Sequence, residues 1–374
     1  MYINLKTLEN LYLKIYIKIS KFKKKMQQKK YKVISASQLN TDKVDDFMKQ
    51  CFTKDKSDFL KKYGNWLYNG NENRHIIFDG DTPVGYFGLI PSKINIEGKE
   101  YKTLTSMDLY VLAQYRGKGI MKTIDSYVKS KESIIISFPN KTSYKIFKKY
   151  GYAVTDKNSI MIFLIKPLLI SQHKRFNIFS KFIMICLFSI IEPFLFLFLR
   201  RHNYQSTKYS YELKNPSIKV LENIFKTQAK DIVTAIRDES YIRRRFFDSP
   251  FFSQYNFFVG GSQNSQSIVI ITRTLIHLGV RQTRVLDIFG NLNDKDGLLD
   301  LIRFAIKDSI KKKSAYITFH VSLSSLRSTL LKSGFFPITR SRFRCLHNSE
   351  NIMQEIMKKK AHWSLSDSDN DSFD

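Results

Sequence analysis

Residues 111–120 read Val111-Leu112-Ala113-Gln114-Tyr115-Arg116-Gly117-Lys118-Gly119-Ile120. The pattern predicts a strand that ends near Val111, a loop with two glycines, and a helix that begins at the end of the loop. Glycines let the backbone turn so that successive N–H groups point to one side. The start of a helix adds further unpaired N–H groups and partial positive charge. With Arg116 and Lys118 beside it, the loop is expected to hold a diphosphate.

Two common phosphate-binding loops are excluded at this position. The segment lacks the GxxxxGK[ST] pattern of a Walker A loop and the three-glycine spacing of a Rossmann loop. A two-glycine turn alone is weak evidence, because many strand–helix junctions contain one. Its meaning depends on the segments around it.

A second segment follows about twenty residues later and reads Phe138-Pro139-Asn140-Lys141-Thr142-Ser143-Tyr144-Lys145-Ile146-Phe147-Lys148-Lys149-Tyr150-Gly151-Tyr152. We expect a helix that starts after Asn140 and ends before the pair Gly151-Tyr152. Taken together, the two segments resemble the GNAT superfamily of acetyltransferases. Gln114, Gly117 and Gly119 fit the pattern Q/R-x-x-G-x-G/A of that family, and the likeness covers roughly residues 31–166.

The resemblance implies a mixed α/β (α+β) fold whose fourth and fifth strands splay apart around the pantetheine arm of acetyl-CoA. It also implies direct transfer of the acyl group to an amine. In such a site, backbone groups near the fourth strand stabilise the charge that develops on the thioester oxygen. The implied coenzyme-binding residues are Val111, Gln114, Tyr115, Arg116, Gly117, Lys118, Gly119, Ile120 and Asn140.

The catalytic residues are less clearly marked. Where the family carries a tyrosine general acid, this chain has Phe147, and Tyr144 lies one helical turn earlier as a substitute. Asp108 is the candidate general base, and it reaches the same face as Val111 only if a bulge interrupts the strand. For each of Tyr144 and Asp108, a packing or positioning role is the open alternative. Positioning of the two substrates can supply much of the rate, so the base can be weakly specified.

The second half of the chain repeats the order strand, helix, strand, helix and Gly-aromatic, at 280–290, 294–312, 315–320, 324–333 and 334–336. This order suggests an internal duplication, hence two GNAT-like domains, each a splayed mixed sheet flanked by helices. The glycine loop is missing from the second copy, and Asp294 and Asp296 would repel phosphate there. We expect the second domain to be degenerate and to shape the acceptor pocket. Arg244 and Arg245 are its candidate substrate-binding residues, with a solvated helix face as the alternative.

The expected organisation has five parts. They are a basic amphipathic helical extension (1–30), an acyl-CoA-binding domain (31–170), an apolar interdomain helix (171–205), a degenerate domain (206–348), and a C-terminal helix with an acidic tail (349–374). The extension could lie on an anionic membrane or on the protein itself, and Met26 could be the true start. For 182–199, a buried or interfacial helix is preferred over surface anchoring and over a membrane span, because Glu192 and Pro193 interrupt it. A solvated tail is preferred over one that folds back near a polar site.

Composition bounds the function further. The chain has 374 residues and a net charge of +29. The lysines are spread along the sequence and no nucleic-acid-binding motif accompanies them, so nucleic acid is not the favoured partner. Three distant cysteines and unpaired histidines predict no metal and a reducing, cytoplasmic compartment. Peripheral contact with the inner membrane face is left open.

The sequence thus predicts acetyl transfer from acetyl-CoA to an amine. The favoured acceptor is an amino sugar of envelope polysaccharide metabolism, nucleotide- or lipid-linked, which the resemblance implies. A small-amine acetyltransferase and a non-catalytic acyl-CoA-binding module are the alternatives.

Overall fold

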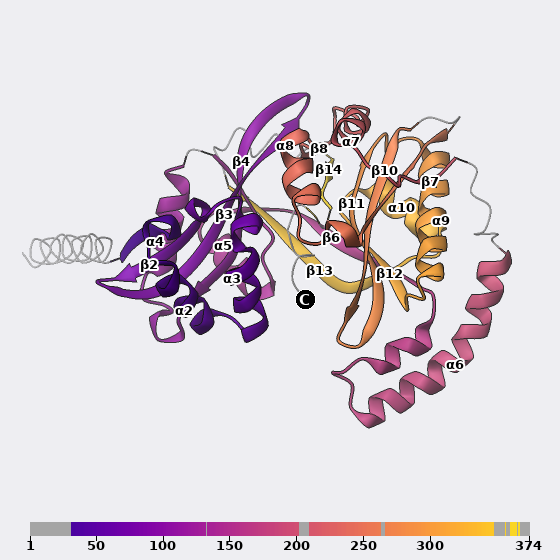
Figure 1. Ribbon diagram of the computed structural model, residues 1–374, viewed down its shortest axis with the longest axis horizontal. Coiled ribbons are helices and arrows are strands. Elements are labelled where there is room, and N and C mark those ends of the chain that lie inside the picture. The colour runs from indigo at the N-terminus through magenta and orange to yellow at the C-terminus, as the bar shows by residue number, and fades with distance from the viewer. Residues whose placement is uncertain are drawn as a thin grey trace, which may run out of the picture. The chain divides into compact units, whose positions relative to one another are not determined.

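A computed structural model describes residues 31–131, 133–201, 209–262, 266–347, 356, 360–364 and 366. The contacts within the chain define two compact units (Figure 1). The first unit comprises residues 31–90 and 106–133, and the second comprises 91–105 and the residues from 134 onward. The extension expected over 1–30 lies outside the described residues. The domain boundaries expected from the sequence stay predictions.

Short helices and antiparallel strands build the first unit. Its elements are β1 (Tyr31–Ser35), α2 (Thr41–Cys51), α3 (Lys54–Tyr68), β2 (Arg74–Asp79), the start of β3 (Thr82–Ile96), the end of β4 (Lys99–Val111) and α4 (Ile120–Lys129). β2 pairs antiparallel with both β1 and β3. Apolar side chains of α2 and α3, among them Phe47 and Leu60, form a buried core with Ile76 of β2 and Tyr86 of β3. This core fixes α3 against the strands.

The hairpin of β3 and β4 continues from the first unit into the second. Its distal part, residues 91–105, belongs to the second unit, where Ile94 pairs with Ala235. Ile94 and Ile96 are each 1% exposed there and pack in a core cluster with Val233. The first unit is therefore interrupted in sequence by a segment of the second.

The second unit contains a larger mixed sheet in the strand order β5-β13-β6-β12-β11-β10-β9-β7. The remaining elements of this unit are β5 (Ile134–Ser137), α5 (Lys141–Lys149), β6 (Ala153–Leu164), α6 (Ile178–Arg201), β7 (Tyr211–Glu212), α7 (Ile218–Phe225), β8 (Val233–Ala235), α8 (Glu239–Ile242), β9 (Tyr255–Gly260), β10 (Ile268–His277), β11 (Val280–Gly290), α9 (Lys295–Lys311), β12 (Tyr316–Val321), α10 (Ser324–Lys332), β13 (Phe336–His347) and β14 (Ala361–His362). β11 and β12 run parallel, and the neighbouring pairs of this sheet are antiparallel.

Alternating strand residues cover both faces of this sheet. Phe258 and Ile270 pack with α9 and α10, whereas Phe257 and Ile271 pack with α7 and α8. This is the two-residue period of a strand that is buried on both faces. The mixed α/β class and the sheets flanked by helices are therefore as predicted.

Helix α6 differs from the preferred expectation for 182–199. It stands at the margin of the second unit in Figure 1, and Phe182, Ile190 and Phe194 are 65%, 65% and 69% exposed. Phe188 is buried, with Met184 and Ile191 partly so, along one narrow side. The expectation of a buried helix was wrong for these residues, because only that side finds a partner. None of the described helices has the length and apolarity that crossing a bilayer requires.

His75 on β2 makes the stability of the first unit sensitive to acid. The ring is 4% exposed and stacks on Phe87 at 4.9 Å. Burial lowers the pKa of His75 from 6.5 to about 4. The unfolded chain therefore binds a proton between these values and the folded chain does not, so stability falls as the pH drops through this window.

We expect the free energy of unfolding to fall by up to about 3 kcal/mol between about pH 6.5 and about pH 4 because of His75. His75→Phe keeps the ring stack and removes the proton, so its unfolding free energy should depend less on pH. Urea unfolding of both proteins at about pH 7.5 and about pH 4.5 measures the difference. Equal pH slopes would contradict the assignment.

Candidate functional site

The backbone of β4 is irregular at Asp108, a feature that we term the β4 bulge. This residue has φ of 50° inside β4, in the left-handed region that a side chain rarely adopts. A carboxylate at this position is held by two donors from α3. The Tyr68 hydroxyl donates to Asp108 Oδ2 at 2.5 Å, and Lys56 Nζ is hydrogen-bonded to Asp108 Oδ1. The Asp108 side chain is 12% exposed, so the charge is mostly shielded from water.

Tyr68 connects this carboxylate to a buried polar chain. Its ring lies edge-on to Tyr86 at 6.1 Å, and the Tyr86 hydroxyl accepts a hydrogen bond from Arg74 Nε at 3.2 Å. Burial raises the pKa of Tyr86 to about 12 and that of Tyr68 well above its ordinary value. Both phenols therefore stay protonated at neutral pH, and Tyr68 acts as a donor toward Asp108.

Gly88 on β3 leaves the space that the Tyr68 ring occupies. A Cβ added at Gly88 would lie 2.0 Å from Tyr68 Cε1, which no side chain could accommodate. The glycine thus lets the ring of α3 lie flat against the strand. Lys56, one turn into α3, lies over the Phe52 ring with its nitrogen 4.6 Å from the centroid. The aromatic contact steers the ammonium group toward Asp108.

The two-glycine loop follows β4 directly and is open to solvent. Arg116, Gly117, Lys118 and Gly119 are all exposed. Gly117 and Gly119 have φ of 79° and 93°, and an added Cβ at either would meet no atom within 4 Å. The turn therefore needs glycine for its backbone conformation, and its outer side is free to receive a ligand.

Backbone donors and positively charged side chains lie together at this loop. The N–H of Lys122 bonds to the Gly119 carbonyl at 3.0 Å. This bond begins α4, so the amides of Ile120 and Met121 lie before it at the N-terminus of the helix. Arg116 Nε donates to the Val111 carbonyl at 3.0 Å, which fixes this guanidinium beside the loop.

Gln114, Tyr115 and Lys118 complete the loop. Gln114 is exposed, and Lys118 Nζ lies 5.3 Å from the centroid of the Tyr115 ring. The Lys118 carbonyl accepts a hydrogen bond from the Tyr31 hydroxyl at 3.2 Å, which ties the loop to β1. The loop is thus anchored to β1 through Tyr31, and its other side is exposed to solvent. Its role in binding a coenzyme stays a prediction.

The residues predicted from the segment 138–152 lie in the second unit. Asn140 caps α5, because its Oδ1 accepts the Ser143 N–H at 2.9 Å. Phe147 is 6% exposed and meets Tyr152 edge-on at 4.9 Å, so the aromatic ring serves packing. Tyr144 is partly buried on the same helix. The expected roles of Asn140 and Tyr144 are not decided by these contacts.

The arginine cluster of the second unit is only partly solvated. Arg243 and the two following arginines belong to a π-helical turn that continues α8. Arg245 is fully buried, and its Nε donates to the Ser366 carbonyl at 3.2 Å. Arg244 is partly buried, with its guanidinium 6.0 Å from the Tyr241 ring centroid. Arg245 thus holds the chain's own tail here, and a substrate role for the pair stays a prediction.

At the corresponding point of the second unit, the described residues 290–297 form no open glycine loop. Asp294 caps α9, and its Oδ1 accepts the Gly297 N–H at 3.0 Å. Its Oδ2 accepts the Ser262 N–H at 2.6 Å. A carboxylate of the protein thus takes the helix-terminal donors that a phosphate would need.

Sequence reasoning missed the partners of Asp108. Lys56 and Tyr68 lie at the two ends of α3, and nothing in the sequence pattern separates them from ordinary surface and core positions. Cys51, on α2, offers no alternative chemistry, because burial raises the pKa of its thiol to about 12. Among the described residues, no group of three His, Cys, Asp or Glu side chains is placed to hold a metal ion.

Comparison with known proteins gives a family match for the N-terminal part of the chain and a likeness in fold over most of it. Residues 32–155 match a family model described as an acetyltransferase (GNAT) domain. The sequence has no significant match among curated proteins. Likeness to solved structures extends over most of the chain, including both units.

Three of these structures illustrate the likeness. A GCN5-related N-acetyltransferase from Anabaena variabilis has a TM-score of 0.56 at 13% identity, covering 84% of this chain and 72% of that one. A probable N-acyltransferase from Enterococcus faecalis has a TM-score of 0.56 at 10% identity, covering 88% and 74%. Saccharomyces cerevisiae N-myristoyltransferase, with bound myristoyl-CoA, has a TM-score of 0.55 at 12% identity, covering 86% and 83%. At such identities the likeness concerns the fold, and the predicted fold is confirmed.

A charge reversal in the loop tests its predicted role. Gly117→Glu should lower the affinity for acetyl-CoA at least about tenfold, because a carboxylate would repel the diphosphate and crowd its place. Thermal-shift or calorimetric titration with acetyl-CoA measures the change. Gly80→Glu is the matched control, since Gly80 is also an exposed glycine of the first unit with positive φ and no neighbours near an added Cβ. Equal binding by both variants would show that the loop is not the diphosphate site.

Proposed function

Because residues 32–155 match a family model described as an acetyltransferase (GNAT) domain, we propose that this protein transfers an acyl group, in the first instance acetyl, from acyl-CoA to an amine. One observation carries the proposal beyond the fold. A carboxylate on a strand bulge, Asp108, lies three residues before Val111 and shortly before an exposed two-glycine loop at a helix N-terminus. The first unit thus offers a place for the diphosphate and a proton acceptor on the same strand–loop segment.

The coenzyme is proposed to bind through its diphosphate at residues 115–120. The amides of the helix N-terminus, together with Arg116 and Lys118, would neutralise its charge. Arg116 is already held by the Val111 carbonyl, so less side-chain freedom is lost when the ligand arrives. The same logic explains why a glycine is needed at both 117 and 119, where a side chain would also strain the backbone.

The proposed reaction is direct attack. The amine nitrogen bonds to the thioester carbon, the C–S bond breaks, the electron pair leaves with the CoA thiolate, and the amine loses a proton. Asp108 is the proposed acceptor of that proton, through direct contact or one water. Tyr68, kept protonated by burial, holds Oδ2 and orients the carboxylate. A thiolate leaves without an obligatory acid, so Phe147 in place of a tyrosine is compatible with turnover.

Lys56 gives this site a further property. Its ammonium group occupies Asp108 Oδ1, and its side chain is 22% exposed. An incoming substrate ammonium carries the same charge and can replace Lys56 at that oxygen. We expect the lysine to hold the carboxylate in place in the free enzyme and to be displaced by the acceptor.

The acceptor proposed is an amino sugar of envelope polysaccharide metabolism, the substrate class implied by the sequence resemblance. The myristoyl-CoA bound by the yeast neighbour makes acyl length a separate question for this chain. A non-catalytic acyl-CoA-binding module is the second candidate, and the buried Phe147 is the observation that favours it. Release of free CoA separates the two candidates.

Asp108→Asn should lower kcat on the order of 10²-fold, because an amide cannot accept the amine proton. The KM for acetyl-CoA should change little. The assay follows thiol release with acetyl-CoA and myristoyl-CoA, each with glucosamine, spermidine and a glycine-terminated peptide. Asp81→Asn, at the exposed turn between β2 and β3, is the matched control.

A retained kcat in Asp108→Asn would remove this residue from the chemistry. Coenzyme binding without thiol release by wild type, with any of these acceptors, would favour the binding module instead.

A peripheral contact with an anionic membrane is proposed for α6. Six residues at helical spacing form what we term the α6 stripe: Phe179, Ile183, Cys186, Ile190, Phe194 and Leu197. Phe179 is 72% and Leu197 is 59% exposed, and the stripe extends over roughly 27 Å at 1.5 Å per residue. Soluble monomers rarely expose a continuous apolar surface of this size.

Charge identifies the occupant that fits the α6 stripe. Lys174 and Arg175 are exposed just before the helix, Arg200 and Arg201 end it, and the chain carries a net charge of +29. An apolar stripe with basic flanks suits the interface of an anionic bilayer, where it would lie in the plane of the headgroups. Such a contact would bring the protein to a surface that carries lipid-linked acceptors.

Ile190→Glu should lower partitioning onto phosphatidylcholine vesicles that contain phosphatidylglycerol by about tenfold, because a charge must then enter the apolar layer. Co-sedimentation measures bound protein, with lipid-free samples run in parallel. Ile276→Glu is the matched control, since Ile276 lies outside the stripe at 64% exposure, compared with 65% for Ile190. Equal partitioning of both variants, or sedimentation without lipid, would contradict membrane binding.

A further inference from the structure

β11 and β12 of the second unit are paired only along part of their length. The parallel register joins Gln282, Thr283 and Arg284 to residues 316–318. Within the described residues the pairing ends there, although β11 continues to Gly290 and β12 to Val321. Two parallel strands that separate leave backbone groups on each inner edge that need other partners.

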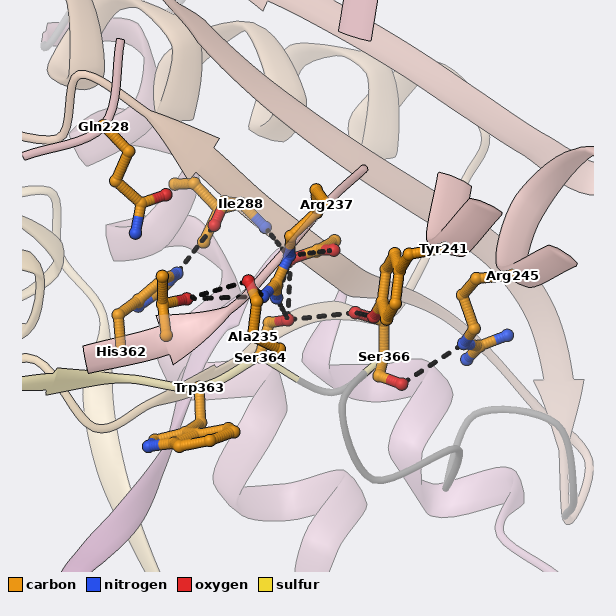
Figure 2. Close-up of polar contacts among 12 residues, drawn as sticks. Gln228, Ala235, Arg237, Tyr241, Arg245, Ile288, His362, Trp363, Ser364 and Ser366 are labelled. Carbon is orange, nitrogen blue, oxygen red and sulfur yellow. Dashed lines mark hydrogen bonds and ion pairs between the residues drawn. The ribbon is translucent and has the colours of Figure 1, made fainter. Parts of the chain in front are cut away.

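Residues 361–364 of the C-terminal segment supply contacts to both sides of this opening, and Figure 2 shows the contact of His362 with Ile288 on the β11 side. On the β11 side, His362 Nε2 lies 2.6 Å from the Ile288 carbonyl oxygen, and the Ser364 hydroxyl donates to Asp287 Oδ1 at 2.6 Å. On the β12 side, the Ser322 hydroxyl donates to the Ala361 carbonyl and accepts the Trp363 N–H, both at 2.9 Å. The tail thus bridges the two strands where they no longer pair.

A buried ion pair anchors the tail from the strand side. Arg237 and Asp287 are both fully buried, and Arg237 Nη2 lies 3.0 Å from Asp287 Oδ1. The same nitrogen donates to the Ser364 hydroxyl at 3.0 Å. Burial opposes ionisation of Asp287, but the Arg237 guanidinium and the tail hydroxyls outweigh it and lower the pKa of this carboxyl. The tail therefore completes the hydrogen bonding of a charge pair that cannot reach water.

Two more anchors hold the tail on either side of Ser364. Trp363 is 1% exposed and packs with Ile94, Val233 and Ile356, with its ring edge-on to Phe138 at 6.1 Å. At Ser366, Tyr241 and Arg245 bind the hydroxyl and the carbonyl, at 3.0 and 3.2 Å (Figure 2). The indole lies in an apolar site, the Ser364 hydroxyl is bound by a charged pair, and the Ser366 hydroxyl is bound by neutral hydroxyl groups, so each position of the tail has its own kind of partner.

The described tail residues correct the preferred expectation of a solvated tail. Ser364 and Ser366 are 3% and 2% exposed, so they fold back onto a polar site as the alternative expected. The acidic residues 367–374 lie outside the described residues. The reason is chemical: the Arg237–Asp287 pair needs hydroxyl partners, and the sequence pattern of the tail gives no sign of them.

We propose that the opening between β11 and β12, together with β8, is a peptide-binding site whose ligand is the chain's own C-terminal segment, recognised through Trp363, Ser364 and Ser366. β8 pairs with the backbone of residues 361–362, the apolar cluster binds the indole, and the Arg237–Asp287 pair binds the Ser364 hydroxyl. Asp294 caps α9, so its carboxylate already takes a donor that a phosphate would need. The inference does not depend on acyl transfer by the first unit.

The first experiment releases the tail while the rest of the chain stays in place. A protease recognition sequence is inserted in residues 350–353 of the full-length protein and cut after purification. The fragment should stay bound through size-exclusion chromatography, and a fluorescent peptide of residues 354–374 should exchange into the cut protein with saturable binding. Ser364→Ala with Ser366→Ala in that peptide should weaken binding at least about tenfold, because each hydroxyl is fully buried. Ser372→Ala is the matched control and should bind as the parent peptide does.

Loss of the fragment from a still-folded protein, with no peptide exchange, would overturn the proposal. A second measurement on the uncut chain covers the case in which cutting unfolds it. The chain has two tryptophans, so Trp66→Phe leaves Trp363 as the sole emitter. Its fluorescence should be blue-shifted and resistant to iodide quenching, and Asp287→Asn should increase the quenching. Quenching as fast as that of a free indole would equally overturn the proposal.

Coenzyme stoichiometry separates this inference from the proposed function. Calorimetry with acetyl-CoA should give one site per intact chain. Two sites would overturn the assignment of the opening to the tail, whereas no binding would contradict the first-unit proposal and leave the tail site to the peptide test.

Discussion

A carboxylate placed within a sheet needs donors, since burying a charge without partners is strongly unfavourable. The protein meets this constraint twice, at comparable points of two strands. Asp108 lies on the bulge of β4, and Asp287 lies next to a register shift between β10 and β11. Each carboxylate determines what must be packed around it. The surrounding elements of each unit can be understood from the donors that its aspartate receives.

The two solutions lead to different surfaces. In the first unit, Tyr68 and Lys56 come from a helix, and one of these donors is a flexible ammonium that another cation can replace. In the second unit, the donors are a rigid, fully buried guanidinium and the hydroxyl of Ser364. Asp108 therefore stays partly accessible to solvent, whereas Asp287 is covered by the C-terminal segment of the same chain. The helix N-termini differ in the same way. That of α4 follows an exposed glycine loop, whereas that of α9 is capped by the Asp294 carboxylate.

Most of the fold could be predicted from local sequence patterns. The strand 280–290 and the helices over 120–129 and 295–311 were within reach, because their apolar periodicity and glycine boundaries are local properties. The bulge at Asp108 could be expected from the resemblance alone, but its partners could not. Lys56 and Tyr68 are joined to it by packing between distant segments, which depends on the space left by Gly88. The role of the tail was hidden for the same reason, since Ser-rich acidic sequence is also what a solvated terminus looks like.

The long hairpin of β3 and β4 has a consequence for biosynthesis. The distal part, with Ile94 and Ile96, finds its partner strand at Val233–Ala235. A ribosome adding about 5–20 residues per second needs on the order of ten seconds to supply that strand. During this interval two isoleucines emerge from the ribosome with no cover, on strands whose other ends already belong to a finished unit. The nascent chain therefore exposes an apolar, aggregation-prone hairpin that a chaperone or slow translation would have to protect. An expression fragment that ends near residue 170 lacks the partner strand and would expose this hairpin permanently.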